Sequence, residues 1–335
     1  MSPKTTPNAA SVSAGRQERL EWRSRSKERR KLLPHRTKCK LDYDGAEMRL
    51  APSAEEVQAR LGDAWPISGA VDCHAHVFER GFPLAAARTF DPLPYPLEYY
   101  LAWTQALGIR RCVQVNASCY GLDNSVTRYA LDECRANGVA ARGVATIHPE
   151  IGYVELEKLA RGGFVGARLM TSRIGSLGLE AFEEVAKRCL PHRWHVEINV
   201  DACEEWVALE PRLAKSPVPV VFEHLGRIED QQGANAPGLC AVLRLLDKRP
   251  DFVLKLSSFY RLLPNAGFED VAPIVKLFAR DFPDRLMWGS NLPHAGWSGG
   301  APDDLELIGA ALEWLPDSVA RQRVFADNAE RFYGL

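Results

Sequence analysis

The sequence lacks the features that mark membrane, exported and nucleic-acid-binding proteins. No stretch of its 335 residues approaches the roughly 18 consecutive apolar residues that span a bilayer. No apolar signal-peptide core follows the first basic residue. The formal net charge is −1, so the whole chain offers no electrostatic basis for binding nucleic acid or a membrane surface. We therefore expect a cytoplasmic protein with neither kind of partner.

Several sequence motifs are also missing. The eight cysteines form no C-x-x-C pair and lie in apolar or helical segments, which is typical of reduced, buried thiols. There is no G-x-G-x-x-G turn, which argues against a dinucleotide-binding doubly wound sheet. There is no G-x-S-x-G either, so a nucleophilic Ser118 or Cys119 lacks the strand-turn-helix motif that would support it.

The first part of the chain differs in composition from everything after it. Residues 1–40 contain twelve Lys and Arg against three Glu and few apolar side chains. Such a segment has little apolar surface to bury, so we expect residues 1–50 to be a solvated extension that is disordered or partly helical. Contact with nucleic acid or an acidic partner is the alternative for this segment. Residues 51–335 are then expected to form one domain.

From residue 70 onward, β-like runs alternate with helical segments. Helices are indicated at 96–108, 124–138 and 268–282 by apolar residues at helical spacing, and the first two end in Gly. Eight strands alternating with helices over this length predict an α/β fold, the (β/α)₈ or TIM barrel. The eight runs are 70–78, 111–118, 141–148, 164–171, 194–201, 219–226, 252–260 and 285–291.

Polar residues gather where these strands end, which in a (β/α)₈ barrel is the catalytic face. In "VDCHAHVFER" (71–80), alternation along a strand would place Asp72, His74, His76 and Phe78 on one face. Imidazoles, guanidinium groups and amides follow most of the other strands. The candidate site residues are His74 and His76, Ser118, Arg168 and Arg173, Asn199, His224, Arg261, Asn291 and His294.

These motifs together resemble one family. "DCHAHVF", "ASCYGLDN", "RGVATIHPE", "GARLM", "FEHLG", "KLSSFYRL" and "MWGSNLPH" are similar to the amidohydrolase superfamily, in its amidohydrolase-2 branch. Within it the chain looks like the 2-pyrone-4,6-dicarboxylate lactonases and 4-sulfomuconolactone hydrolases. The similarity runs from about residue 68 to the end and leaves out the basic extension. It implies a barrel of the metallo-dependent hydrolase type that acts on an anionic lactone.

The resemblance also implies roles for the residues. His74, His76 and His224 would surround the scissile carbonyl, and Arg168, Arg261 and a third arginine near Arg173 would hold the acid groups of the substrate. The chemistry agrees, because guanidinium groups bind carboxylate or sulfonate through paired hydrogen bonds. Further substrate contacts are expected from Ser118, Asn199 and His294. The alternative for Arg168 and Arg261 is a structural salt bridge.

The chain departs from the family pattern at three positions. The aspartate after the eighth strand is Asn291, and two substrate-facing tyrosines are replaced by Phe90 and Asn199. Asn cannot accept a proton at neutral pH, so water would be activated by His224, His74 or His76 with a pKa near 6.5, or by a metal hydroxide. Glu197, one layer deeper, is a further candidate base.

A divalent metal, zinc first, would be held by His74, His76 and His224, and metal-free catalysis is the alternative. The changed pocket favours 4-sulfomuconolactone, which hydrolysis converts to maleylacetate and sulfite in aromatic-compound degradation. The alternatives are a 2-pyrone-4,6-dicarboxylate lactonase, a metal-dependent decarboxylase and a non-catalytic barrel that binds organic anions. We expect a monomer or a small homo-oligomer.

Overall fold

The computed structural model describes residues 51–171, 174–228, 235–262, 268–296 and 302–335. The basic extension and Arg173 therefore lie outside the described residues. Within those residues, no helix has the length and apolar character that crossing a membrane requires.

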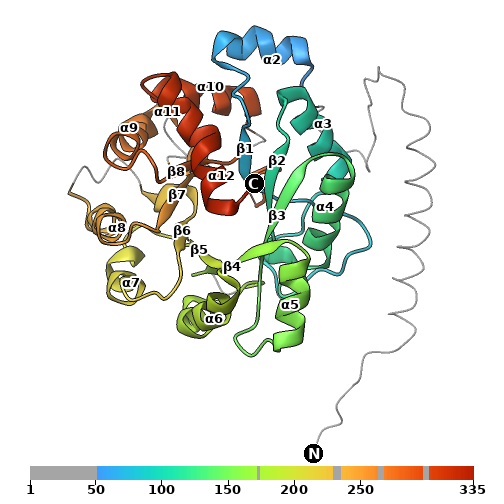
Figure 1. Cartoon of the computed structure of the whole chain (residues 1–335), viewed down its shortest axis with the longest axis vertical. Coiled ribbons are helices and arrows are strands. Elements are labelled where there is room, and N and C mark those ends of the chain that lie inside the picture. Colours follow the sequence, from blue (N-terminus) through green and yellow to red (C-terminus); the bar gives the residue numbers. More distant parts are fainter. Residues whose placement is uncertain (1–50, 172–173, 229–234, 263–267, 297–301) are drawn as a thin grey trace, which may run out of the picture.

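Eight parallel strands form one sheet in the order β1 to β8 (Figure 1). The sheet closes into a barrel where β1 meets the end of β8. There the N–H of His76 donates to the Leu292 carbonyl (2.7 Å) and the N–H of Asn291 donates to the His74 carbonyl (2.7 Å). Each of the eight predicted runs overlaps an observed strand, so the predicted (β/α)₈ barrel is confirmed. The strands are β1 (Val71–Ala75), β2 (Arg111–Val115), β3 (Ala140–Ala145), β4 (Phe164–Met170), β5 (His195–Asn199), β6 (Val220–Phe222), β7 (Val253–Leu256) and β8 (Leu286–Trp288).

Helices surround the strands as an outer layer (Figure 1). Two of them end where the sequence predicts. The first ends at Gly108 in the left-handed conformation and the second at Asn137, followed by Gly138 with φ of 75°. The α-helices are α2 (Ala54–Leu61), α3 (Leu97–Leu107), α4 (Ser125–Ala136), α5 (Tyr153–Arg161), α6 (Phe182–Cys189), α7 (Glu205–Leu213), α8 (Pro237–Lys248), α9 (Ala272–Asp281), α10 (Asp304–Trp314), α11 (Ser318–Gln322) and α12 (Asn328–Tyr333).

An apolar cluster links the starts of the barrel strands to the last helix. Val71 and Val253, the first residues of β1 and β7, pack in one cluster with Ala329 and Tyr333 of α12. This helix closes the N-terminal end of the barrel and lies over its centre in Figure 1. The opposite, C-terminal end of the barrel is the one where the sequence places the site.

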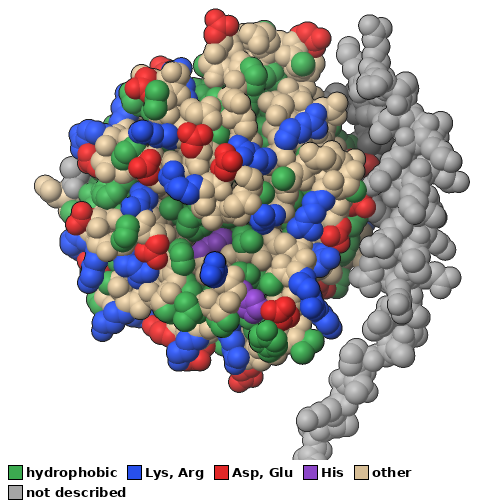
Figure 2. Space-filling view, in the orientation of Figure 1, with side chains coloured by type: hydrophobic (Ala, Val, Ile, Leu, Met, Phe, Trp, Pro, Cys, Tyr) green, Lys and Arg blue, Asp and Glu red, His purple; other side chains and the backbone are tan. Residues whose placement is uncertain are grey.

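The outer surface carries both signs of charge. On the face drawn in Figure 2, Lys and Arg side chains are interspersed with Asp and Glu. This face therefore presents no field of a single sign.

Candidate active site

Strand β1 brings two predicted histidines together, although its side chains do not alternate strictly. The pairing of β1 with β2 shifts register between Asp72 and Ala75. Asp72 accepts hydrogen bonds from the Tyr100 hydroxyl of α3 (3.0 Å) and the Ser290 hydroxyl (2.7 Å). His74 instead contacts His76, with 3.2 Å between the two Nε2 atoms. The prediction that Asp72 shares a face with both histidines is wrong, because the irregularity comes between them.

His224 completes a cluster of three buried imidazoles. It follows β6 at φ of 54°, and its ring centroid lies 4.9 Å from that of His74. The His74 and His76 centroids are also 4.9 Å apart. His224 therefore lies beside His74, although 150 residues separate the two in the sequence.

The partners of these rings fix where the protons lie. Nδ1 of His76 is 2.8 Å from the Val115 carbonyl, which can only accept, so Nδ1 carries the proton. Nδ1 of His74 is 3.3 Å from Nζ of Lys255, an ammonium that can only donate. His74 therefore carries its proton on Nε2 and donates it to Nε2 of His76. The third ring pairs Nδ1 with the Ser257 hydroxyl (2.9 Å).

All three imidazoles are neutral at physiological pH. Burial lowers the pKa of His76 to about 3, and the Arg168 charge adds to the effect. Burial also holds the pKa of His74 well below the usual range, and the Lys255 charge lowers it further. The pKa of His224 is low for the same reason, with the Arg227 charge as the second cause. The expectation of ordinary values near 6.5 is therefore not met, and these rings are weak bases.

Lys255, on β7, contacts His74 and was missed by the sequence reasoning. Its Nζ lies 2.7 Å from both carboxylate oxygens of Glu197 on β5, and both side chains are fully buried. Tyr333 and His195 also contact Glu197 (3.0 and 3.2 Å). Burial would raise the pKa of Glu197, but the Lys255 ammonium lowers it overall. Glu197 is thus a permanent anion that holds Lys255 rather than a base. A lysine inside the apolar run "FVLKL" was the available signal.

Arg168 forms a second buried ion pair. Its Nε and Nη2 donate to Oε1 and Oε2 of Glu223 at 2.8 and 2.6 Å, and the Glu223 side chain is 0% exposed. This arrangement matches the structural salt bridge that was the alternative for Arg168. It leaves Nη1 as the nitrogen that could face a substrate.

Arg227 and Arg261 form a cationic subsite beside the imidazoles. The pKa of Arg227 is lowered by burial and next by the charge of Arg261. Nε of Arg227 is buried without a hydrogen-bond partner among the described residues, and Oδ1 of Asn199 is in the same state. Arg261 donates to the carbonyl oxygens of His294 (3.0 Å) and Ala295 (2.5 Å). Two adjacent guanidinium groups, one of which has a buried Nε without a partner among the described residues, suit an anionic ligand. Sequence reasoning missed Arg227, three residues after His224 in a loop-like stretch.

The predicted residues after β8 also line this end of the barrel. Nδ2 of Asn291 donates to the hydroxyls of Tyr260 (3.0 Å) and Ser258 (3.2 Å), and His294 contacts Tyr260 (2.8 Å). Ser118, by contrast, is half-buried and begins a short turn after β2. No hydrogen bond among the described residues joins it to the imidazoles.

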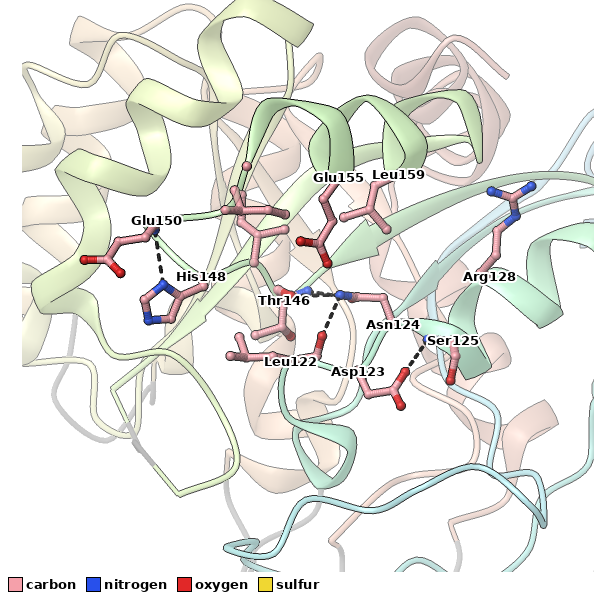
Figure 3. A pocket seen from close by; sticks show the side chains of 13 residues that line it. Leu122, Asp123, Asn124, Ser125, Arg128, Thr146, His148, Glu150, Glu155 and Leu159 are labelled. Carbon is pink, nitrogen blue, oxygen red and sulfur yellow. Dashed lines mark hydrogen bonds between the residues drawn. The ribbon is translucent and has the colours of Figure 1, made fainter. Parts of the chain in front are cut away.

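A cavity lies elsewhere in the described residues. It measures about 630 Å³ and is lined by residues of α4, α5 and the segment after β3, among them Asn124 and His148 (Figure 3). Nδ1 of His148 accepts the N–H of Glu150 (3.1 Å), a local turn contact. None of the clustered imidazoles borders this cavity, so chemistry rather than volume locates the candidate site.

Comparison with known proteins places this geometry in a family. The family model described as "Amidohydrolase" matches residues 71–335. The chain belongs to the amidohydrolase family. This confirms the predicted resemblance and, with it, the prediction of a hydrolytic enzyme.

Relatives of this amidohydrolase carry three different names. The chain is 32% identical to a 4-sulfomuconolactone hydrolase of Rhizobium radiobacter, over 80% of this chain and 90% of the relative. It is 31% identical to a 2-pyrone-4,6-dicarboxylate hydrolase of Comamonas testosteroni (79% and 90%). It is 32% identical to a D-galactarolactone isomerase of Agrobacterium fabrum (80% and 91%). A solved structure from Agrobacterium tumefaciens, ATU3138, superposes with a TM-score of 0.73 at 31% identity, covering 82% of this chain and 98% of that one.

The spacing of this amidohydrolase's ligand atoms suits a metal, but their surroundings do not. Atoms of His74, Glu223 and His224 lie within 4.8 Å of one another, which makes a candidate metal cluster. A metal-bound histidine normally donates its other N–H to an acceptor, whereas His74 faces the Lys255 ammonium (3.3 Å). Glu223 is held by Arg168. A resident dication therefore fits this arrangement poorly, and we derive no step through one.

Proposed function

We propose that the protein hydrolyses an unsaturated, multiply anionic lactone, with 4-sulfomuconolactone as the first candidate. The observation that carries the proposal is the cluster of neutral, buried imidazoles next to the guanidinium groups of Arg227 and Arg261. A lactone carbonyl needs hydrogen-bond donors where negative charge develops, and acid groups on the ring need fixed cations. This site offers both in one place.

The imidazoles act on the carbonyl. Nε2–H of His74, held in that tautomer by Lys255, can turn from His76 to the carbonyl oxygen of the substrate. A neutral imidazole donates a hydrogen bond without adding net charge to the site. That hydrogen bond becomes stronger as negative charge develops on the carbonyl oxygen. His224 stands beside it, and its Ser257 contact sets the orientation of its ring.

The arginines orient the anion. Arg227 and Arg261 bind the sulfonate or carboxylate groups, while Nη1 of Arg168 supplies a third contact from its ion pair with Glu223. The Phe90 ring packs against that of Phe78, with 6.1 Å between centroids, and Phe78 stacks on His76, with 6.4 Å between centroids. An apolar surface therefore takes the position of a tyrosine in the resembled lactonases. The loss of that hydroxyl, together with Asn199, argues against 2-pyrone-4,6-dicarboxylate as the substrate.

Two other activities deserve a direct comparison. A relative at 32% identity is named D-galactarolactone isomerase, so isomerisation of a sugar lactone is the second candidate. A metal-dependent decarboxylase or a zinc hydroxide on His74, His76 and His224 is less compatible with Lys255. Metal analysis of the purified protein and turnover after chelation separate those two cases from metal-free hydrolysis.

The test is a comparison of kcat/KM on 4-sulfomuconolactone, 2-pyrone-4,6-dicarboxylate and D-galactarolactone. We expect the highest value on 4-sulfomuconolactone, with loss of lactone absorbance and release of sulfite. His224→Asn should remove most turnover, and Asn291→Ala should cost less. Preference for D-galactarolactone with formation of an isomeric lactone would replace hydrolysis by isomerisation, and no turnover of any lactone would contradict the proposal.

A further inference from the structure

The proposed hydrolysis needs a group that takes a proton from water, and the obvious candidates do not serve. Asn291 has no basic atom. The three clustered imidazoles have their pKa lowered by burial, so they accept protons poorly. Glu197 and Glu223 are committed to Lys255 and Arg168.

A different chain of hydrogen bonds starts at Asn291. Its Nδ2 lies 3.0 Å from Oη of Tyr260, Oη lies 2.8 Å from Nδ1 of His294, and Nε2 of His294 lies 2.8 Å from Oδ1 of Asp304. Tyr260, His294 and Asn291 are buried, and Asp304 is half-buried. These hydrogen bonds connect the segment after β7, which holds Tyr260, with the segment after β8, which holds Asn291 and His294. They end at Asp304, the first residue of α10.

The partners set the direction of this chain. The Asp304 carboxylate accepts, so the tautomer of a neutral His294 that fits this contact has its proton on Nε2 and a bare Nδ1. Nδ1 must then accept the hydroxyl proton of Tyr260. One lone pair of Oη accepts the Asn291 amide, and the long contact from Nε of Arg261 (3.4 Å) is the one that the reacting water would replace. This order of groups, hydroxyl to imidazole to carboxylate, is the arrangement that activates a hydroxyl in hydrolases.

We propose that Tyr260, His294 and Asp304 form the proton relay that activates water, in the place of the missing carboxylate after β8; this rests on the proposed hydrolysis. Water gives a proton to Oη of Tyr260 as the Tyr260 hydroxyl proton passes to Nδ1 of His294. The hydroxide bonds to the lactone carbonyl carbon, and the carbonyl π electrons move to its oxygen. The electron pair of that oxygen then re-forms the C=O bond as the ring C–O bond breaks, and the leaving oxygen takes the proton back from His294 through Tyr260.

The charges around the relay favour both of its transient ions. Arg261 lies over the Tyr260 ring (5.6 Å) and Arg227 interacts electrostatically with the same phenol, so a developing phenolate faces two cations. Asp304 faces the imidazolium that forms on His294. Tyr95 is the further titratable group near Asp304. Tyr260 would touch the reacting water, whereas Asp304 acts through His294 and is a positioning residue.

The test compares Tyr260→Phe, His294→Gln and the double variant. Because general-base catalysis contributes about 10²–10⁴-fold, each single variant should lower kcat by at least about 10²-fold with KM changed little. The double variant should be no slower than the worse single variant, because the residues act as one unit. Asp304→Asn should move the acidic limb of kcat to lower pH, since the imidazolium loses its carboxylate. A purely structural role would lower the unfolding temperature instead and leave the limb in place.

Two further measurements keep the proposal falsifiable. Asn291→Asp should restore part of the kcat lost in Tyr260→Phe, because it supplies a base at the same spot, while doing little or harm in the unmutated protein. A Tyr260→Phe variant within about fivefold of full kcat overturns the relay. If the unmutated protein hydrolyses no lactone, the proposed function fails separately, and ¹⁵N-histidine NMR still decides the relay: a proton on Nδ1 of His294 contradicts it.

Discussion

Arg168→Met should destabilise the protein far more than an arginine substitution of similar geometry at the surface. The variant leaves the Glu223 carboxylate without its partner at 0% exposure. Removing one member of a buried ion pair typically costs about 3–5 kcal/mol of the free energy of unfolding. Burial raises the pKa of Glu223 and Arg168 opposes that rise, so loss of Arg168 should raise it further. The penalty should therefore be larger at pH 8.5 than at pH 6, because the carboxyl group escapes it by binding a proton.

Urea denaturation followed by circular dichroism measures this effect. Arg212→Met is the matched control, because Arg212 pairs with Glu183 at the same 2.8 and 2.6 Å but in a largely exposed position. That variant should cost about 1 kcal/mol or less. Adding Glu223→Gln to Arg168→Met should recover stability. Equal denaturation midpoints for Arg168→Met and Arg212→Met, with a large rise in KM for the first, would refute the reasoning and return Arg168 to substrate binding alone.

Four other predictions follow from the same contacts. Arg261→Met should lower kcat/KM by about 10²-fold with little change in unfolding temperature, since a charge-assisted contact to the substrate is worth about 1.5–3 kcal/mol; unchanged kinetics would count against the anion subsite. Lys255→Met combined with Glu197→Gln should bind zinc that the unmutated protein does not retain, as measured by metal analysis after dialysis. His76 has a pKa near 6.5 in the unfolded chain and of about 3 in the folded protein, so the unfolded state binds the proton first as pH falls. This residue should therefore lower the free energy of unfolding by about 1.4 kcal/mol between pH 7.5 and 5.5. In urea denaturation, His76→Gln should remove this contribution to the pH dependence. Deletion of residues 1–50 should leave kcat nearly unchanged, and loss of folding on deletion would make the extension part of the domain.

The fold was predictable because its signals are local. Apolar runs of strand length alternate with amphipathic helices, and Gly108 and Gly138 end two helices where the chain needs a left-handed residue. Strand ends were less predictable. The apolar run at 219–226 continues past β6, which stops at Phe222 because the backbone turns to positive φ at His224 and Leu225. Nothing in the residue types alone marks that turn.

The site was predictable to the extent that residue type reveals chemistry. The convergence of His74, His76 and His224 followed from their places at the ends of strands. The partners of these residues did not follow, because Lys255 meets Glu197 across the barrel interior from a strand two positions away. Such pairings depend on which side chains point into the barrel at the same height along its axis. The register shift in β1 changes the side to which Asp72 points. The distances that decide tautomer and charge are therefore structural information.

The central claim, hydrolysis of an anionic lactone by the imidazole cluster, is tested most directly by the stoichiometry of product formation. Purified protein and its His224→Asn variant would be incubated with 4-sulfomuconolactone while lactone loss, sulfite and released acid are measured together. We predict one sulfite for each lactone consumed, with acid released in proportion, and about 10²-fold or greater loss of rate in the variant at unchanged unfolding temperature. Lactone consumed without sulfite or acid, or a His224→Asn variant as fast as the unmutated protein, would contradict the account.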